Sequence, residues 1–498
     1  MTTRRAVIDI GSNSVRLVIY EGPPRTPIAV FNEKALCGLG DRVPETGALR
    51  QAAMDEALRV LRRFAAVLRD DSIQRLHVFA TAASREAPNG PGFLAEVRAT
   101  GFEPTLLTGE EEARLAALGI LSGAPEVLTE PGGALAGDMG GGSLELSRLL
   151  RGAPEGIAHR ASLPLGGLRL STLFVGDMAG AKRATREALS ALAWLGGADG
   201  QPAPRTFFVV GGAWRAIGRL AIARDDHPIR ILDHYGLPSS RMIELCRLVE
   251  RQSAETLAAT PGVQSRRAPT LPYAAMVLRK VIERSGVQRV AVSSCGVREG
   301  SLFADLTAEG RRADPLIALC GHYADRLSPG SAARRRAIYG FLAPAFAGET
   351  PREARLRRAA TKLANVAGLF HPDARANEAG VTVLNMPFIS LTHEERVMLA
   401  AALYQRHTSA AADFPAHLHT QLLTEDEADW ARRVGLGLRF ATDLDPVGTD
   451  ALPVASLSVT GNALRLHLAE DDEAYLGDAP RRRFERFAGA LGLSAVVA

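Results

Sequence analysis

The feature that most constrains the fold is a short pattern that occurs twice. Residues 9–14 read Asp-Ile-Gly-Ser-Asn-Ser, and residues 138–143 read Asp-Met-Gly-Gly-Gly-Ser, 129 residues further along the chain. An apolar run precedes each copy and another follows it, which predicts two strands joined by a tight glycine turn. Because the separation is one domain's length, the pattern indicates a duplicated domain and not a short solenoid repeat.

Two more apolar runs end in glycine turns. Residues 207–210 lead into Gly211 and Gly212, and residues 290–292 lead into the segment 293–296. After about Thr307 the glycine turns give way to helical patterns, with one hairpin expected around Gly461-Asn462. We therefore predict an α/β protein with two duplicated domains around a cleft, residues 1–130 and 131–307, and a mainly helical domain, residues 308–498.

Composition excludes several classes of protein. Hydrophobic residues make up 46% and charged residues 23% of the chain, which excludes a disordered protein or a coiled coil. The four cysteines are far apart and form no CxxC pair, so neither a disulfide scaffold nor a cysteine zinc site is expected. No apolar run reaches the ~18–20 residues that a membrane span needs. We expect no signal peptide, because no apolar h-region or cleavage site follows the first residues. We expect a cytoplasmic protein that binds neither membrane nor nucleic acid.

Two glycine turns that face each other would suit a phosphate chain. Turn N–H groups form anion-binding nests, glycine permits close approach, and the hydroxyls of Ser12, Ser14 and Ser143 would add donors. Asp9 and Asp138 open the two turns and would repel bare phosphate, so they predict a Mg²⁺ ion between protein and ligand. For one turn alone, an Asp folded back on its own backbone is an alternative explanation; the matched pair favours a site.

Two further segments carry candidate site residues. Around residues 109–114, Thr108 and Glu111 fit a helix capping box and Glu110 suits the helix dipole. Glu112 is then the one carboxylate of this segment without a structural role. Thr81 and Arg85 follow a predicted strand. They would contribute a hydroxyl and a phosphate clamp, or else a helix cap and a solvated arginine.

A cluster of basic residues lies near the start of the helical domain. Between residues 331 and 362, eight basic side chains stand against two acidic ones, although the whole chain has a net charge of only +4. Such a cluster would guide a long polyanion toward the cleft, or it is a solvated helix face. The candidates for this track are Arg334, Arg335, Arg336, Arg355 and Arg358.

The motifs together resemble a known family. Residues 6–17, 80–87, 109–114, 137–145, 164–170, 210–212 and 296–300 are similar, in order, to signatures of the Ppx/GppA phosphatases. These enzymes are exopolyphosphatases and guanosine pentaphosphate phosphohydrolases with the fold of actin, sugar kinases and chaperone ATPases. The resemblance covers about residues 5–305 and implies two ribonuclease-H-like domains around a phosphate cleft.

The resemblance also implies an activity and roles for single residues. It implies Mg²⁺-dependent hydrolysis of the terminal phosphate of inorganic polyphosphate, with Glu112 as the base that activates water. Asp9, Asp138 and Glu145 would be metal ligands, and relatives suggest a homodimer. The implied phosphate-binding residues are Gly11, Ser12, Asn13, Ser14, Thr81, Arg85, Gly140, Gly141, Gly142, Ser143, Gly211 and Gly212.

The chain departs from the family pattern in two places. Leu144 stands where the second motif usually has threonine, which matters little if that side chain points away from the cleft. The third domain is expected to be HD-like but degenerate, because the segment 363–367 lacks the metal-binding pair. Hydrolysis of guanosine pentaphosphate (pppGpp, with ppGpp as a related ligand), an ATP-dependent kinase or ATPase, and a non-catalytic polyphosphate-binding regulator stay open as alternatives.

Overall fold

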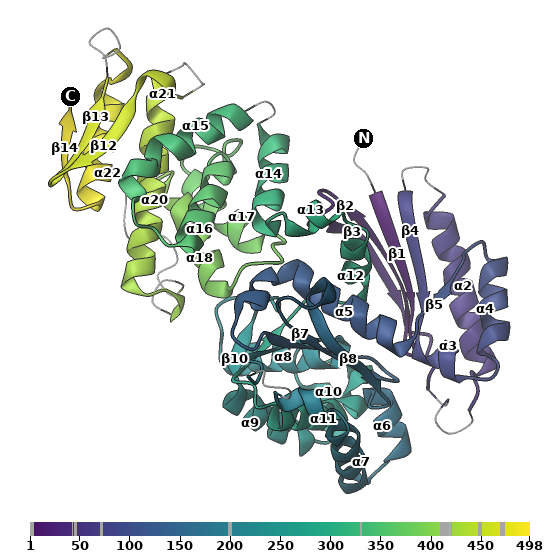
Figure 1. Ribbon diagram of the computed structural model, residues 1–498. Coiled ribbons are helices and arrows are strands. Elements are labelled where there is room, and N and C mark those ends of the chain that lie inside the picture. Colours follow the sequence, from purple (N-terminus) through teal and green to yellow (C-terminus); the bar gives the residue numbers. More distant parts are fainter. Residues whose placement is uncertain are drawn as a thin grey trace. The chain divides into compact units, whose positions relative to one another are not determined.

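The chain forms two compact units, Met1–Ala313 and Asp314–Ala498 (Figure 1). The structure is a computed structural model, and each unit is described by itself below. The described residues are 4–41, 43, 47–69, 73–197, 202–328, 331–408, 418, 421–446, 451–468 and 474–498.

The first unit opens with a five-stranded sheet in the order β3-β2-β1-β4-β5. Its strands are β1 (Arg4–Ile10), β2 (Val15–Glu21), β3 (Ile28–Ala35), β4 (Ile73–Ala80) and β5 (Thr105–Leu106). β1 runs antiparallel to β2 and parallel to β4. The helices α2 (Gln51–Val67) and α4 (Gly90–Ala99) bury one apolar face against this sheet, and the short α3 (Ala82–Glu86) follows β4.

A second sheet of six strands follows in the order β10-β11-β9-β6-β7-β8. Its strands are β6 (Ala134–Met139), β7 (Leu144–Leu149), β8 (Ile157–Leu163), β9 (Thr206–Val210), β10 (Gly236–Pro238) and β11 (Arg289–Val292). The accompanying helices are α6 (Gly167–Leu173), α7 (Met178–Ser190), α8 (Gly212–Arg224), α9 (Ser239–Glu250), α10 (Ala254–Ala259) and α11 (Leu271–Ser285). The core beside this sheet is apolar and includes the fully buried Trp214.

The two sheets confirm the predicted duplication. The run β3-β2-β1-β4 in the first matches β8-β7-β6-β9 in the second, each with one parallel and two antiparallel pairings. The register also agrees: Asp9 pairs with Arg16, and Asp138 pairs with Glu145. In both turns a glycine N–H donates to a serine carbonyl at 3.0 Å, from Gly11 to Ser14 and from Gly140 to Ser143.

The helices α5 (Gly109–Gly123) and α12 (Val297–Ala304) connect the two halves. They pack so closely that a Cβ at Gly300 would lie 1.8 Å from the Leu115 carbonyl oxygen. The apolar cluster around α5 takes Val7 from the first sheet and Phe208 from the second. The expected boundary at residue 130 therefore crosses a shared core, and α13 (Ala308–Arg312) still belongs to the first unit.

The second unit is mainly helical, as expected. Its larger helices are α14 (Pro315–Leu327), α15 (Ala332–Leu342), α16 (Pro351–Leu363), α17 (Arg375–Asn385), α18 (His393–Gln405), α20 (Glu425–Leu444) and α22 (Asp478–Ala490), with a short α21 (Ala451–Val454). The predicted hairpin is present as β12 (Ser456–Thr460) and β13 (Ala463–His467). A third strand that the sequence did not predict, β14 (Ser494–Val497), pairs in parallel with β13 beside α22 (Figure 1).

Among the described residues, no helix has the length and apolar character that crossing a bilayer would require. All four cysteines are buried and free of disulfides.

Candidate active site

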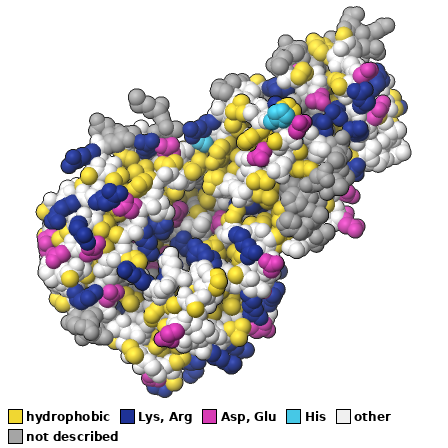
Figure 2. All heavy atoms as spheres, turned by 180° about the vertical axis from the view of Figure 1, so that it is seen from behind, with side chains coloured by type: hydrophobic (Ala, Val, Ile, Leu, Met, Phe, Trp, Pro, Cys, Tyr) yellow, Lys and Arg dark blue, Asp and Glu magenta, His cyan; other side chains and the backbone are white. Residues whose placement is uncertain are grey.

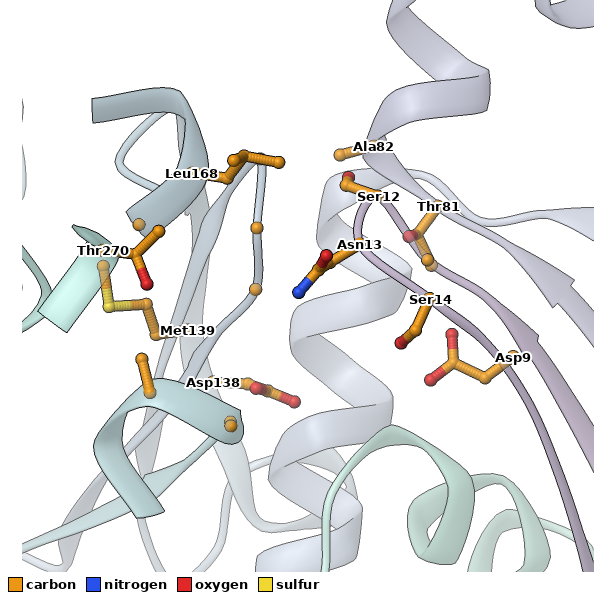
Figure 3. A pocket seen from close by; sticks show the side chains of 18 of the residues that line it. Asp9, Ser12, Asn13, Ser14, Thr81, Ala82, Asp138, Met139, Leu168 and Thr270 are labelled. Atoms are coloured by element: carbon orange, nitrogen blue, oxygen red, sulfur yellow. The ribbon is translucent and has the colours of Figure 1, made fainter. Parts of the chain in front are cut away.

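The two glycine turns line one cavity of about 720 Å³ in the first unit. Figure 3 shows Asp9, Asn13 and Ser14 on one side of it and Asp138 on the other. The structure brings together every predicted site residue of this unit except Arg85. The predicted residues in the lining are Asp9, Gly11, Ser12, Asn13, Ser14, Thr81, Glu112, Asp138, Gly140, Gly141, Gly142, Ser143, Glu145, Gly211 and Gly212.

Close contact between the turns explains why glycines occupy the second one. A Cβ at Gly141 would lie 3.2 Å from the Ser12 Cβ, and a Cβ at Gly142 would lie 3.0 Å from the Ala82 Cβ. Larger residues would push the two turns apart. The loop that follows β3 supports the first turn, because the Gly40 N–H donates to the Ser12 carbonyl at 2.7 Å.

The carbonyl oxygens of the second turn accept hydrogen bonds from Gly166 and from the first residues of α6. N–H groups of Gly166, Gly167 and Leu168 donate to the carbonyls of Gly142, Gly140 and Gly141, respectively, at 3.0–3.3 Å. Carbonyl oxygens held in this way are turned toward the start of α6, where they would not repel a phosphate. The side chain of Leu144 is fully buried in the core, so the departure from threonine at this position removes no group from the cavity wall.

Glu112 lies at the start of α5, and its backbone position is fixed by the predicted cap. The Thr108 hydroxyl accepts from the Glu111 N–H at 3.1 Å. Arg85 lies behind Glu112 instead of lining the cavity: its Nη1 is 3.4 Å from the Glu112 Oε2 and donates to the Leu107 carbonyl at 2.7 Å. Arg85 therefore orients the Glu112 carboxylate. Thr81 makes no side-chain cap to α3, which leaves its hydroxyl available to the cavity.

Four carboxylates lie together in this cavity, of which Glu112 and Glu145 are buried and Asp9 and Asp138 are half-buried. Burial raises the pKa of Glu112 to about 7; Arg85 opposes the shift, and Asp138 and Asp9 add to it. Burial likewise raises the pKa of Asp138 to about 6 and raises that of Asp9. Burial and the neighbouring Glu112 raise the pKa of Glu145, which accepts a hydrogen bond from the Ser162 hydroxyl at 2.8 Å. Such crowding of negative charge favours a bound cation or a retained proton.

Seven basic side chains that were not predicted from the sequence as site residues also line the cavity. They are Arg16, Lys34, Arg215, Arg219, Arg266, Arg267 and Arg298. Arg215 and Arg267 hydrogen-bond the carbonyls of Gly211 and Gly212 at 3.3 and 2.5 Å. Burial, reinforced by the neighbouring arginines, lowers the pKa of Lys34 to about 8 and that of Arg16 to about 10. A polyanionic ligand would relieve this mutual repulsion.

Arg298 lies beside Glu299, with 3.9 Å between its Nε and the Glu299 Oε1, and hydrogen bonds fix that carboxylate. The Tyr20 hydroxyl donates to Glu299 at 2.6 Å, and the Gly296 N–H donates to the same carboxylate at 2.9 Å. Burial alone would lower the pKa of Arg298, but Glu299, Tyr20, Asp9 and Asp138 raise it above its ordinary value. Arg298 is therefore a fixed positive charge beside the two turn aspartates.

The donor set fits a magnesium ion that is bound partly by substrate. Within the part of the chain that the structure describes, no three His, Cys, Asp or Glu side chains converge closely enough to hold a metal ion alone. Mg²⁺ commonly binds through one or two carboxylates, several waters and substrate phosphates. Asp9 and Asp138, which point toward the same space in Figure 3, suit that mode of binding.

Most arginines of the predicted polyanion track are paired with acidic side chains. Arg334, Arg335 and Arg355 pair with Asp445, Asp325 and Asp314, all within the second unit. Arg336 and Arg358 are exposed, and Arg358 lies over the Tyr339 ring. Lys and Arg side chains are spread over much of the face in Figure 2, so exposed cations alone do not define a track.

Comparison with known proteins agrees with this geometry. The model of the Ppx/GppA phosphatase family matches residues 4–309, and the model described as exopolyphosphatase, C-terminal matches residues 334–497. Exopolyphosphatase 1 of Mycobacterium tuberculosis is 27% identical over 322 residues, which cover 61% of this chain and 89% of that protein. An uncharacterised Streptomyces coelicolor protein is 31% identical over 327 residues, covering 60% and 89%.

Solved structures show the same fold. The Aquifex aeolicus member of the Ppx/GppA family has a TM-score of 0.51 at 24% identity and covers 61% of this chain and 98% of its own. An exopolyphosphatase from Cytophaga hutchinsonii has a TM-score of 0.54 at 23% identity, covering 60% and 97%. With the matched motifs gathered in one cavity, the chain belongs to the Ppx/GppA phosphatase family and is a phosphoanhydride hydrolase.

Proposed function

We propose that the chain is a magnesium-dependent exopolyphosphatase, which removes the terminal phosphate of inorganic polyphosphate and releases orthophosphate. The observation that carries the proposal is the joint placement of both glycine turns, the buried Glu112 and seven basic side chains around one cavity. The names of the mycobacterial relatives support the same substrate.

The roles of the residues follow from their positions. Glu112, with a pKa of about 7, accepts a proton from the attacking water near neutral pH. The two turns hold the terminal phosphates, and the basic side chains bind the chain behind them. Asp9, Asp138 and Glu145 are the candidates to hold Mg²⁺, which when bound would neutralise charge on the phosphate oxygens.

The character of the cavity wall favours an inorganic chain over a nucleotide. None of its described lining residues is aromatic, so the wall offers no ring on which a guanine base would stack. The repeated positive charges suit a ligand with one negative charge per phosphate. Hydrolysis of pppGpp is the alternative that the same scaffold would serve. The homodimer and the cytoplasmic location remain predictions from the sequence.

Rates measured side by side on long-chain polyphosphate, pppGpp and ATP test the proposal. We expect phosphate release from polyphosphate to have the highest kcat/KM, to vanish in EDTA and to return with Mg²⁺. A higher kcat/KM on pppGpp than on polyphosphate would show that pppGpp is the preferred substrate and would contradict the proposal. Full activity in the chelator would remove the metal from the mechanism.

A further inference from the structure

The second unit contains a pocket of its own, of about 200 Å³. Four basic side chains line it, Arg334, Arg335, Lys362 and Arg406, together with polar side chains of Ser328, Ser331, Thr361, Asn365 and Thr442. None of its described lining residues carries a carboxylate. We propose that this pocket binds a small phosphate oxyanion, orthophosphate or pyrophosphate. The proposal rests only on residues of the second unit and is independent of the proposed function.

The arginines of the pocket have unused donors. The buried Nε atoms of Arg335 and Arg406 have no hydrogen-bond partner among the described residues, and that of Arg334 has only the longer ion pair with Asp445. Leaving a buried donor unpaired costs stability, and an oxyanion would accept from several such donors at once. Burial lowers the pKa of Arg406 only to about 10, so its charge persists at neutral pH.

Nearby carboxylates balance part of this charge from outside the pocket. Arg335 pairs with Asp325, and the Arg334 Nε lies 3.6 Å from Asp445. Asp443 faces Arg406. Lys362 is half-buried and, among the described residues, has neither a hydrogen bond nor an ion pair. The pocket thus keeps a net positive charge that the neighbouring carboxylates do not neutralise.

The size of the pocket selects the ligand class. Sites for drug-sized molecules span about 300–1,000 Å³, so a pocket of about 200 Å³ is too small for a whole nucleotide. One or two phosphoryl groups suit it, because serine, threonine and asparagine side chains stand beside the cations to donate or accept hydrogen bonds. The small volume also distinguishes a bound small ion from a long chain passing over exposed arginines.

Lysine labelling of the full chain tests the proposal, because the chain has only four lysines. Lys362 lines the small pocket and Lys34 lines the large cavity, so each reports on one site. Lys182 and Lys280 pair with Glu250 and Glu283 and line neither pocket, which makes them internal controls. Acetylation of each lysine is followed by mass spectrometry while orthophosphate, pyrophosphate or sodium chloride of equal ionic strength is added.

We expect orthophosphate or pyrophosphate to slow the acetylation of Lys362 about tenfold at ten times its dissociation constant, without slowing that of Lys182 and Lys280. Sodium chloride should have no such effect. Protection of Lys34 reports separately on the large cavity. If Lys34 is not protected, the proposed function is in question, but the result for Lys362 still tests the small pocket. Labelling of Lys362 at one constant rate with both anions would overturn the proposal, as would protection by long polyphosphate alone.

A matched pair of variants on α15 sharpens the test. Arg335→Gln removes a lining cation, whereas Arg336→Gln removes an exposed neighbour that does not line the pocket. Arg335→Gln should raise the concentration for half-protection of Lys362 about tenfold or more, the effect of losing a charged hydrogen bond. If both variants raise this concentration equally, the protection of Lys362 reflects general charge screening and the proposed site is overturned. If Arg335→Gln does not unfold cooperatively, Arg406→Gln serves in its place.

Discussion

At the scale of single residues, the buried Glu112, which we propose as the general base, lowers the stability of the fold when it is ionised. Its pKa is 4.5 in its ordinary state and about 7 in the fold, with burial as the main cause. A carboxyl whose pKa is raised by folding destabilises the fold when it ionises. The folded chain therefore holds this proton over the window from about 4.5 to 7, and stability falls as the pH rises through it.

The first prediction concerns Glu112→Gln in the absence of magnesium and phosphate. Above pH 7 the variant should be more stable than the natural chain, by up to about 3 kcal/mol, because it lacks the buried charge. Below about pH 4.5 the difference should vanish. Thermal or denaturant unfolding of both proteins between pH 4 and pH 8 measures this difference in stability. If the variant is less stable than the natural chain at pH 8, the ionised Glu112 carboxylate does not destabilise the fold, which contradicts the prediction.

The second prediction concerns Arg85, the positioning residue behind Glu112. Its positive charge lowers the pKa of Glu112, so Arg85→Met should move the acid limb of the kcat/KM profile to higher pH. The natural chain should lose activity tenfold per pH unit below about 7. Arg85→Lys keeps the charge and should keep the limb in place. A loss of activity in Arg85→Met with an unmoved limb would show a purely structural role.

At the scale of elements, the start of α6 and Gly166 before it hold the second turn in shape. A Cβ at Gly166 would lie 2.2 Å from the Gly141 carbonyl oxygen, a backbone atom that a side-chain movement cannot displace. At Gly167 the nearest atom would be 3.6 Å away, an ordinary contact. The two neighbouring glycines therefore differ sharply in what they tolerate.

The third prediction uses this pair of glycines. Gly166→Ala should destabilise the fold by about 1–3 kcal/mol, as overpacking does, and should lower phosphate release because the second turn shifts. Gly167→Ala should leave stability within about 0.5 kcal/mol of the natural chain. Calorimetry and the phosphate-release assay follow both. Equal stability of the two variants would show that the start of α6 yields without disturbing the turn.

The turns and the capped helix were predictable because their signals are local. Glycine, serine and aspartate at fixed spacing specify a turn, and Thr108 with Glu111 specifies the start of α5. The basic wall was missed because its members come from separate elements, and only the fold brings them together. One signal was present: Arg215 and Arg219 are four residues apart on the helix that begins at Gly212, so they share a face.

At the scale of the whole molecule, duplication explains both the sheets and the cavity. Each half contributes one turn and one aspartate, and the halves differ where Arg16 in one corresponds to Glu145 in the other. The core that the two halves share was not predicted from the sequence. The helices α5 and α12 lie in different predicted domains, but they pack together in a shared core.

The fourth prediction concerns the first unit alone. The M. tuberculosis exopolyphosphatase 1 is matched over 89% of its length by 61% of this chain, and the candidate active site uses no residue beyond Arg298. A chain of residues 1–313 should therefore fold and release phosphate from short polyphosphate with kcat within about tenfold of the full chain's. Circular dichroism and the same assay check this. A folded fragment without activity would place an essential group in the second unit.

The central claim is that Glu112 activates water for phosphate held between the twin turns, and one comparison tests it most directly. Single-turnover phosphate release with Mg²⁺ is measured for Glu112→Gln and for Glu110→Gln, an exposed neighbour on the same helix turn. We predict that Glu112→Gln slows release about 10²–10⁴-fold, the usual contribution of a general base, while polyphosphate still binds. Glu110→Gln should match the natural chain. Release by Glu112→Gln at the natural rate would contradict the account.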